Sequence, residues 1–297
     1  MAITVGQLRA FLAVVRGGSV TAAADVLVVT QPSVSSAIAA LGRELGCELF
    51  ERAGRGIRLS EAGAAFAPYA EDVIGLLERG RQATREAAAT AQRRLRIAAV
   101  TTAAESFVPP LMRAFSAEYD DVELTLEVGN RDYVLERVLS HGVDVAVSGR
   151  PPEDERLRAE PLIENRIACI TAPEDPAAGA LRSARDLGSR TWLLREPGSG
   201  TRELNERYLE EHDVHPPTLT LGSNGAVKQA ARAGLGVSLL SRAAVEAELD
   251  AGLLGEIRLR DGPSPRPWYV LRSAVGPQRP PVAAFVAFVA FAQADAG

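Results

Sequence analysis

Three short helices are predicted close together near the N-terminus, and this grouping constrains the fold more than any other feature of the sequence. In the first segment, which begins at Val5, apolar side chains recur at three- and four-residue spacing and therefore share one helix face. They are Leu8, Phe11, Leu12 and Val15. Gly17 and Gly18 end this helix.

The next two helices are marked by their caps. Ser19 is a suitable N-cap for a second helix from Val20 to Leu27, and Thr30 for a third that runs to about Leu45. The third helix buries Val34, Ile38, Leu41 and Leu45 and exposes polar side chains near its N-terminal end, namely Gln31, Ser33, Ser35 and Ser36. A recognition helix presents base-reading side chains from that end, so helix-turn-helix DNA binding is the first hypothesis.

A glycine-rich turn between two apolar-flanked arms follows, from Leu49 to Leu59, and predicts a two-stranded wing. The wing carries Arg52, Arg55 and Arg58, whose guanidinium groups are suited to DNA phosphates. A solvated arginine-rich hairpin is the alternative. The position directly after a helix-turn-helix pattern favours the phosphate-binding interpretation.

These residues carry a family resemblance. The segment resembles the N-terminal signature of LysR-type transcriptional regulators along the run LRAFLAVVRGGSVTAAADVLVVTQPSVSSAIAALGRELGCELFERAGRGIRLSEAG. Carried over by position, the resemblance implies that the third helix enters the major groove through Gln31, Pro32, Ser33, Ser35 and Ser36, with Arg52, Arg55 and Arg58 on the DNA backbone. Family members often have Arg, His or Gln where this chain has Ser36 and Ala37, so we expect DNA shape to contribute to specificity.

The formal net charge of −5 is unexpected for a DNA-binding protein, but the charge is unevenly distributed along the chain. Residues 1–96 hold 12 Arg against 9 Asp or Glu, a balance of +3, so residues 97–297 carry −8. The acidic excess therefore lies outside the predicted DNA-binding part. A chain of 297 residues, 46% of them hydrophobic, has material for two or three compact domains.

Cysteine use and hydropathy predict a reduced, cytoplasmic protein. The two cysteines, Cys47 and Cys169, fall in different predicted domains and lack metal-site spacing. No secretory signal pattern opens the chain. The apolar run from Val282 to Ala292 is far shorter than the roughly twenty residues of a membrane span, which indicates a buried terminal helix.

From Ser60 to about Gln92 the sequence is alanine-rich and predicts one long helix, with Pro68 in its second turn. One side of it carries Phe66, Tyr69, Val73, Leu76, Leu77 and Gln82. A largely apolar helix face that extends beyond its own domain usually packs against a partner helix. We expect a dimerising linker helix, residues 60–92, between a DNA-binding domain (1–59) and an effector domain (93–297).

Beyond Arg94 strands alternate with helices, the pattern of parallel α/β structure. The predicted strands are 95–100, 122–128, 143–147, 192–194, 218–221, 236–240 and 268–271, and the helices are 108–116, 133–139, 201–211, 224–233 and the terminal one. The strand at 268–271 is expected to join the sheet formed by the first three strands, 95–100, 122–128 and 143–147. We therefore expect a two-lobed, periplasmic-binding-protein-like module, with lobe I at about 93–165 and 267–297 and lobe II at about 166–266.

A ligand is expected between the lobes, where strand ends and helix N-termini converge. In lobe I the hydroxyls of Thr101, Thr102 and Ser148 follow predicted strands and could hold an anion, although such residues also commonly cap helices. In the family, the resemblance implies that a threonine pair, here Thr101 and Thr102, faces the effector.

Lobe II supplies the segment from Arg195 to Arg202, which joins a strand to a helix. Its glycines let backbone N–H groups converge, Ser199 and Thr201 add hydroxyls, and a helix N-terminus adds positive potential, a combination suited to phosphate or carboxylate. An ordinary Gly-Ser turn capped by Thr201 is the alternative. Ser223 and Asn224, at a second strand-to-helix turn, would cap a helix and could also touch the ligand.

Two stretches, REPGSGTR and GSNGAVKQAARAGLGVSLLSR, resemble the LysR-type branch of metabolite sensors that includes regulators of Calvin-cycle carbon fixation. The resemblance implies a phosphorylated sugar or a nicotinamide nucleotide as effector. No cofactor is expected. An enzyme is the competing class, but the three histidines, His141, His212 and His215, form no catalytic or metal motif, and no G-x-S-x-G or HExxH occurs. A transport-type solute-binding protein would have no use for the first sixty residues.

The sequence thus predicts a DNA-binding transcriptional regulator controlled by a small anionic metabolite. Its expected partners are double-stranded DNA and further copies of itself, as a homodimer or homotetramer.

Overall fold

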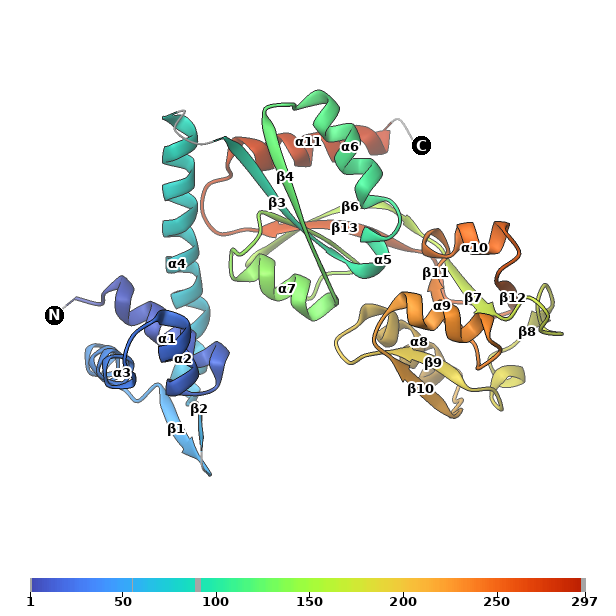
Figure 1. The fold of residues 1–297 in the computed structure, drawn as a ribbon, viewed down its shortest axis with the longest axis horizontal. Helices are drawn as coiled ribbons and strands as arrows, with labels where there is room; N and C mark the ends of the chain where they lie inside the picture. Colours follow the sequence, from blue (N-terminus) through green and yellow to red (C-terminus); the bar gives the residue numbers. More distant parts are fainter. Residues whose placement is uncertain (1, 55, 89–91, 295–297) are drawn as a thin grey trace. The chain divides into compact units, whose positions relative to one another are not determined.

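The computed structural model describes residues 2–54, 56–88 and 92–294, and the chain forms two compact units (Figure 1). The first unit comprises residues 1–91 together with 139–142, and the second comprises residues 92–138 and 143–297.

The first unit contains the predicted helix-turn-helix, wing and long helix. Its elements are α1 (Val5–Gly17), α2 (Val20–Leu27), α3 (Gln31–Leu45), β1 (Phe50–Ala53), β2 (Gly56–Leu59) and α4 (Glu61–Ala87). Ser19 and Thr30 cap α2 and α3 by accepting hydrogen bonds from backbone N–H groups three residues on. Gly46 ends α3 with φ of 70°, a left-handed conformation that glycine adopts without steric cost.

Aromatic rings join the parts of this unit. The ring centroid of Phe11 in α1 lies 5.4 Å from that of Phe50 in the wing and 5.6 Å from that of Phe66 in α4. The apolar side chains of α4 divide between two environments. Phe66 and Ala70 pack on the α1 core, whereas Tyr69 is 69% exposed and Val73 is 50% exposed.

The second unit contains two lobes. Lobe I is built on a five-stranded sheet of order β4-β3-β5-β13-β6. Its strands are β3 (Arg93–Val100), β4 (Val122–Gly129), β5 (Val145–Ser148), β6 (Leu157–Asn165) and β13 (Arg266–Ser273), and its helices are α5 (Thr101–Ala104), α6 (Val108–Glu118), α7 (Arg131–Leu139) and α11 (Pro280–Ala294). The strand predicted to return to the first set is β13, which pairs with β5 and β6 in antiparallel fashion.

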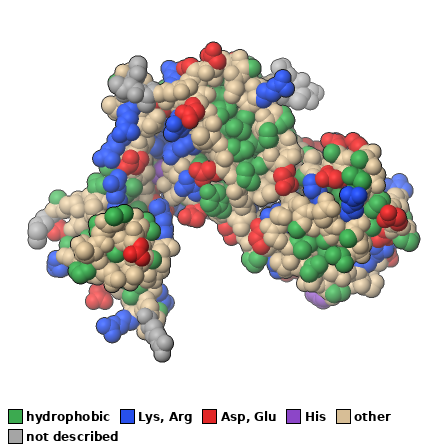
Figure 2. Space-filling view, in the orientation of Figure 1, with side chains coloured by type: hydrophobic (Ala, Val, Ile, Leu, Met, Phe, Trp, Pro, Cys, Tyr) green, Lys and Arg blue, Asp and Glu red, His purple; other side chains and the backbone are tan. Residues whose placement is uncertain are grey.

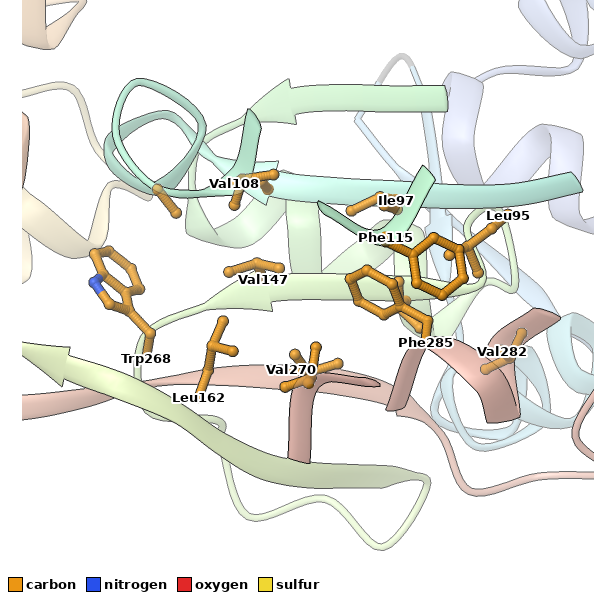
Figure 3. Packing of buried hydrophobic residues seen from close by; sticks show 14 of the residues in the cluster. Leu95, Ile97, Val108, Phe115, Val147, Leu162, Trp268, Val270, Val282 and Phe285 are labelled. Atoms are coloured by element: carbon orange, nitrogen blue, oxygen red, sulfur yellow. The ribbon is translucent and has the colours of Figure 1, made fainter. Parts of the chain in front are cut away.

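In lobe I, α6 and α11 lie on one side of the sheet and α7 on the other (Figure 1). The core beneath α6 and α11 contains Phe115 and Phe285, whose rings meet edge to face at 5.2 Å between centroids (Figure 3). Trp268, at the far end of the same core, stands beside Leu162 (Figure 3). The apolar terminal run is therefore a core helix of lobe I.

Lobe II has a four-stranded sheet of order β11-β7-β12-β8 and a parallel pair, β9 and β10. Its strands are β7 (Ile167–Thr171), β8 (Leu181–Arg182), β9 (Trp192–Arg195), β10 (Thr218–Leu221), β11 (Ser238–Ser241) and β12 (Gly255–Leu259). Its α-helices are α8 (Gly200–Glu211), α9 (Asn224–Arg232) and α10 (Glu246–Asp250), with short 3₁₀ turns at Arg185–Leu187 and Arg242–Ala244. Trp192 belongs to the core that includes α8, and Leu193 to the core that includes α9, so β9 is buried on both faces.

Strands β6, β7, β8 and β12 and the short helices α5 and α10 were not predicted. Strand β6 lies at a sheet edge and exposes most of its side chains, so the alternating apolar pattern is weak there. Strand β6 ends at Asn165 in lobe I, and β7 begins at Ile167 in lobe II. The chain therefore crosses between the lobes at Arg166 and crosses back before Arg266.

Of the helices in the described ranges, no single one has the length and apolar composition to cross a membrane. Helices α2 and α3 meet such a test only when they are counted together, and they are bent by 108° at the break between them.

Candidate functional site

The N-terminal end of α3 exposes every residue that the sequence assigned to DNA contact there, and these are Gln31, Pro32, Ser33, Ser35 and Ser36. On the opposite side, Val34 and Leu41 are buried in the core and fix the rotation of the helix. The Ser33 hydroxyl lies 2.8 Å from that of the cap residue Thr30, so Ser33 is partly engaged by the turn itself.

The wing presents Arg52 and Arg58, both exposed, while Arg55 lies outside the described residues. Arg52 is paired in register with Ile57, and Arg58 with Glu51, so the two arginines project from opposite faces of the two-stranded ribbon. The Glu51 carboxylate lies 2.9 Å from the Arg58 guanidinium and offsets its charge. Figure 2 shows Lys and Arg side chains at the end of the wing. Arg52 is therefore the better placed cation for a phosphate.

A cavity lies between the two lobes of the second unit. It offers about 140 Å³ to water-sized molecules, against the roughly 10–15 Å³ that a single buried water needs, so it has room for a small metabolite. Six of the nine residues that the sequence assigned to effector binding line it, namely Thr101, Thr102, Ser148, Arg195, Ser199 and Thr201.

The N-terminus of α8 forms one wall of this cavity. Ser199, its N-cap residue, is buried and makes no side-chain cap hydrogen bond, and Gly200 and Thr201 of the first turn also line the cavity. The first-turn N–H groups have no partner within the helix and carry its positive end. Thr102 of lobe I faces this turn, with its hydroxyl 3.5 Å from that of Thr201. Hydroxyls of both lobes and a helix N-terminus thus converge on one point.

Arg195 lines the cavity, but its charge is already engaged. Its Nε and Nη2 atoms donate to the Glu196 carboxylate at 2.7 and 2.9 Å, and its Nη1 atom donates to Asn224 Oδ1. Burial raises the pKa of Glu196, but the hydrogen bond and charge of Arg195 outweigh burial and hold that pKa below its usual range. Arg195 therefore orients neighbouring groups more than it attracts an anion.

The other three residues assigned to the effector, Arg202, Ser223 and Asn224, lie outside the cavity wall. Arg202 donates to Glu206 at 2.7 Å and to the carbonyl oxygen of Arg195 at 3.0 Å. Ser223 is exposed and caps α9, as its capping role predicted.

Asn224 is fully buried and connects the lobes. Its Nδ2 atom donates to Thr102 Oγ1 at 3.0 Å and to the Glu105 carboxylate at 3.1 Å, both in lobe I. Because its Oδ1 atom accepts from Arg195, each end of the amide has a defined partner. The cap prediction missed this interlobe role, since it depends on a contact 122 residues away in sequence.

Four further arginines line the cavity and were not predicted from the sequence: Arg131, Arg150, Arg207 and Arg266. Together with Arg195 they face a single lining carboxylate, that of Glu203, and the lining residues include no His or Cys. Arg266 and Asn165 flank the two crossings between the lobes. The predicted lobe boundaries could have pointed to both, because hinge strands border an interlobe cleft.

Three polar side-chain atoms of the cavity wall have no hydrogen-bond partner among the described residues. They are Ser148 Oγ, Ser241 Oγ and Asn165 Oδ1. Ser148 is 1% exposed and Ser241 is 4% exposed, and a buried polar atom without a partner costs about 1–3 kcal/mol. A bound polar ligand would remove that cost. Within the described part of the chain, no cluster of three or more His, Cys, Asp or Glu residues could hold a metal ion.

Comparisons with known proteins agree with this geometry. Residues 5–64 match the model of the bacterial regulatory helix-turn-helix protein, lysR family, and residues 88–293 match that of the LysR substrate binding domain. The RuBisCO operon transcriptional regulator of Allochromatium vinosum is 35% identical over 294 residues, which are 97% of this chain and 96% of that protein.

Two solved structures extend the comparison. The CcmR regulatory domain of Synechocystis PCC6803, solved in complex with 2-PG, has 30% sequence identity and a TM-score of 0.64, and the match covers 68% of this chain and 97% of that one. The LysR family regulator CbnR has a TM-score of 0.63 over 97% of this chain and 98% of its own, at 23% identity, a likeness of fold. The chain belongs to the LysR family of transcriptional regulators, with an N-terminal helix-turn-helix and a two-lobed substrate-binding domain.

Proposed function

We propose that this regulator controls genes of carbon metabolism and that a small phosphorylated metabolite, bound in the interlobe cavity, changes its action on DNA. The observation that carries the proposal is the α8 N-terminus, where hydroxyls of both lobes meet the first-turn N–H groups, which have no acceptor within the helix. The name of the Allochromatium relative and the 2-PG complex of the Synechocystis domain support the regulated process and the anionic ligand. A nicotinamide nucleotide is the second candidate effector.

The proposed division of labour follows the sequence: residues 1–59 bind DNA, residues 60–92 associate with a second copy, and residues 93–297 bind the effector. The exposed Tyr69 and Val73 of α4 support self-association as a homodimer or homotetramer. On DNA, Arg52 and Arg58 hold phosphates while the exposed end of α3 faces the bases. The relatives are transcriptional regulators, which supports a cytoplasmic binding protein without catalytic activity.

The test is a calorimetric titration of the full chain with phosphorylated sugars, phosphorylated hydroxy acids, nicotinamide nucleotides and inorganic phosphate, followed by DNA binding with each ligand found. Selective binding of a phosphorylated compound that alters DNA affinity is expected. The Thr201→Val variant should weaken that binding at least tenfold, because it removes a hydroxyl from the cavity and keeps the side-chain shape.

Thr218→Val is the matched control, because Thr218 is an exposed residue of β10 outside the cavity wall. If the wild type and both variants bind the phosphorylated compound with equal affinity, the ligand does not bind at the α8 N-terminus. Binding that leaves DNA affinity unchanged would refute the regulatory role of the ligand.

A further inference from the structure

Arg266 is a cavity-lining cation with which no described carboxylate forms an ion pair. It begins β13 at the crossing between the lobes, is half-buried and lines the cavity. Within the described ranges, its guanidinium forms no hydrogen bond or ion pair. Burial lowers the pKa of Arg266, and together with the positive charges of Arg207 and Arg131 it outweighs the opposing effect of the Glu203 and Glu211 carboxylates. A half-buried cation in this state is stabilised by any anion that reaches it.

The neighbouring charges do not supply that anion. Two carboxylates, those of Glu203 and Glu211, act on the charge of Arg266, but within the described residues neither forms an ion pair with it. Glu203 is also shared, because its oxygens lie 2.7 Å from Arg207 and 3.8 Å from Arg131. Two of the arginines thus compete for one carboxylate while Arg266 forms no ion pair with it. Three arginines against two carboxylates leave the local balance positive, and a cleft lined by one sign of charge attracts the opposite sign.

This positive group is distinct from the α8 N-terminus. Arg207 is six residues beyond Thr201 on α8, which corresponds to about 9 Å along the helix axis. The cavity extends past both, and Asn165, whose Oδ1 atom has no protein partner in the described chain, is paired in register with Arg266 across β6 and β13. An amide oxygen only accepts hydrogen bonds, so it requires a donor such as a ligand hydroxyl.

We propose that Arg266, supported by Arg207 and Arg131, forms a second anion subsite, so that the effector carries two anionic groups. One group, a phosphate, binds at the α8 N-terminus and the second, a carboxylate or a phosphate, binds Arg266. A hydroxyl between them donates to Asn165. This inference rests on the proposed function, since it assigns a substrate class to the same cavity.

The experiment compares probes that differ only in the second anionic group. Glycerol 3-phosphate and 3-phosphoglycerate share the phosphate and the central hydroxyl and differ in a CH₂OH against a carboxylate. Fructose 6-phosphate and fructose 1,6-bisphosphate form a second pair. Dissociation constants are measured by calorimetry for the full-length wild type, Arg266→Gln and Arg260→Gln. Arg260 is an exposed residue of lobe II outside the cavity, so its variant makes the same change of net charge.

In at least one pair, the wild type is expected to prefer the doubly anionic probe by tenfold or more. Arg266→Gln should reduce that preference to below threefold while the affinity for the singly anionic probe stays within twofold. Arg260→Gln should keep the full preference.

Two results overturn the inference: no preference in the wild type, or a preference that survives Arg266→Gln. In either case the proposed function still stands if Thr201→Val weakens binding of the phosphorylated probes at least tenfold. Failure of all four probes to bind would overturn both the inference and the proposed phosphorylated effector.

Discussion

Replacing Asp144 by Asn should destabilise lobe I far more than the loss of one surface charge. The Asp144 side chain is 1% exposed and accepts from Arg279 at 2.7 Å, from Arg96 Nη2 at 3.1 Å and from the backbone N–H of Arg96 at 2.8 Å. Arg279 itself is 5% exposed. An Asn side chain keeps the volume but removes the negative charge that both guanidinium groups contact, and removing one partner of a buried ion pair costs about 3–5 kcal/mol.

An exposed pair in the same lobe is the matched control. Arg93 and Asp121 are 3.0 Å apart with side chains 51% and 55% exposed, and solvated pairs of this kind contribute about 0.2–1 kcal/mol. Asp121→Asn should therefore lower the free energy of unfolding by less than about 1 kcal/mol. The chain has two tryptophans, one in each lobe, so a Trp192→Phe background leaves Trp268 as the fluorescent reporter of lobe I during urea unfolding.

The effect should also depend on pH in a defined direction. Burial raises the pKa of Asp144, but the hydrogen bonds and charges of Arg96 and the charge of Arg279 outweigh it, and the pKa lies below its usual range. A carboxyl with a lowered folded-state pKa stabilises the fold above the unfolded pKa of about 3.9, and this contribution is lost as pH falls through the folded value. The difference between wild type and Asp144→Asn should be constant from neutral pH to about 5 and shrink below about 4. Equal, small losses for Asp144→Asn and Asp121→Asn at neutral pH would refute this account.

Three further predictions concern the first unit. Val28→Asn should raise the stability of this unit by about 1 kcal/mol, because Val28 has φ of 56° and a left-handed backbone costs an ordinary side chain about 1–2 kcal/mol. Val26→Asn, on the exposed face of α2, should not raise it, and thermal unfolding compares the two variants. Gly63→Ala should destabilise the unit by about 1–3 kcal/mol, because a Cβ there would lie 2.1 Å from the Leu49 carbonyl oxygen. Gly80→Ala in the same helix meets nothing within 4 Å and should stabilise the unit. A loss of stability in both variants, or in neither, would contradict this packing. Arg52→Gln should weaken binding to all DNA sequences alike and reduce the slope of log affinity against log salt by about one unit; loss at a single operator would argue for base contact instead.

Local patterns predicted the first unit well, since caps, glycine stops and apolar spacing act within a few residues. Ser19, Thr30 and Gly46 each mark a helix boundary that the structure confirms. The sheet of lobe I was harder, because β6 at its edge pairs with β13 more than a hundred residues later and exposes most of its side chains.

The residues of the cavity also could be predicted only where a local sequence pattern marks them. Hydroxyls that follow strands, such as Thr101 and Ser148, are visible as a pattern because strand ends meet at one sheet edge. Arg207 faces the cavity from the second turn of a helix, and Arg266 faces it from a hinge, so neither belongs to a motif. Arg195, the most prominent arginine in the sequence, is engaged by Glu196, a partner whose orientation only the folded loop defines.

The contacts between the lobes bear on how a ligand would act. Thr102 Oγ1 accepts from Asn224, so its own proton is directed elsewhere, and Thr201 Oγ1 lies 3.5 Å away. One ligand oxygen at a normal hydrogen-bond distance of about 2.7 Å from both hydroxyls is compatible with that separation. An anion can therefore bind both lobes without parting them at this point. Because a ligand shifts an equilibrium only through its different affinity for the two states, an anion held in this way favours the arrangement in which Asn224 bridges the lobes.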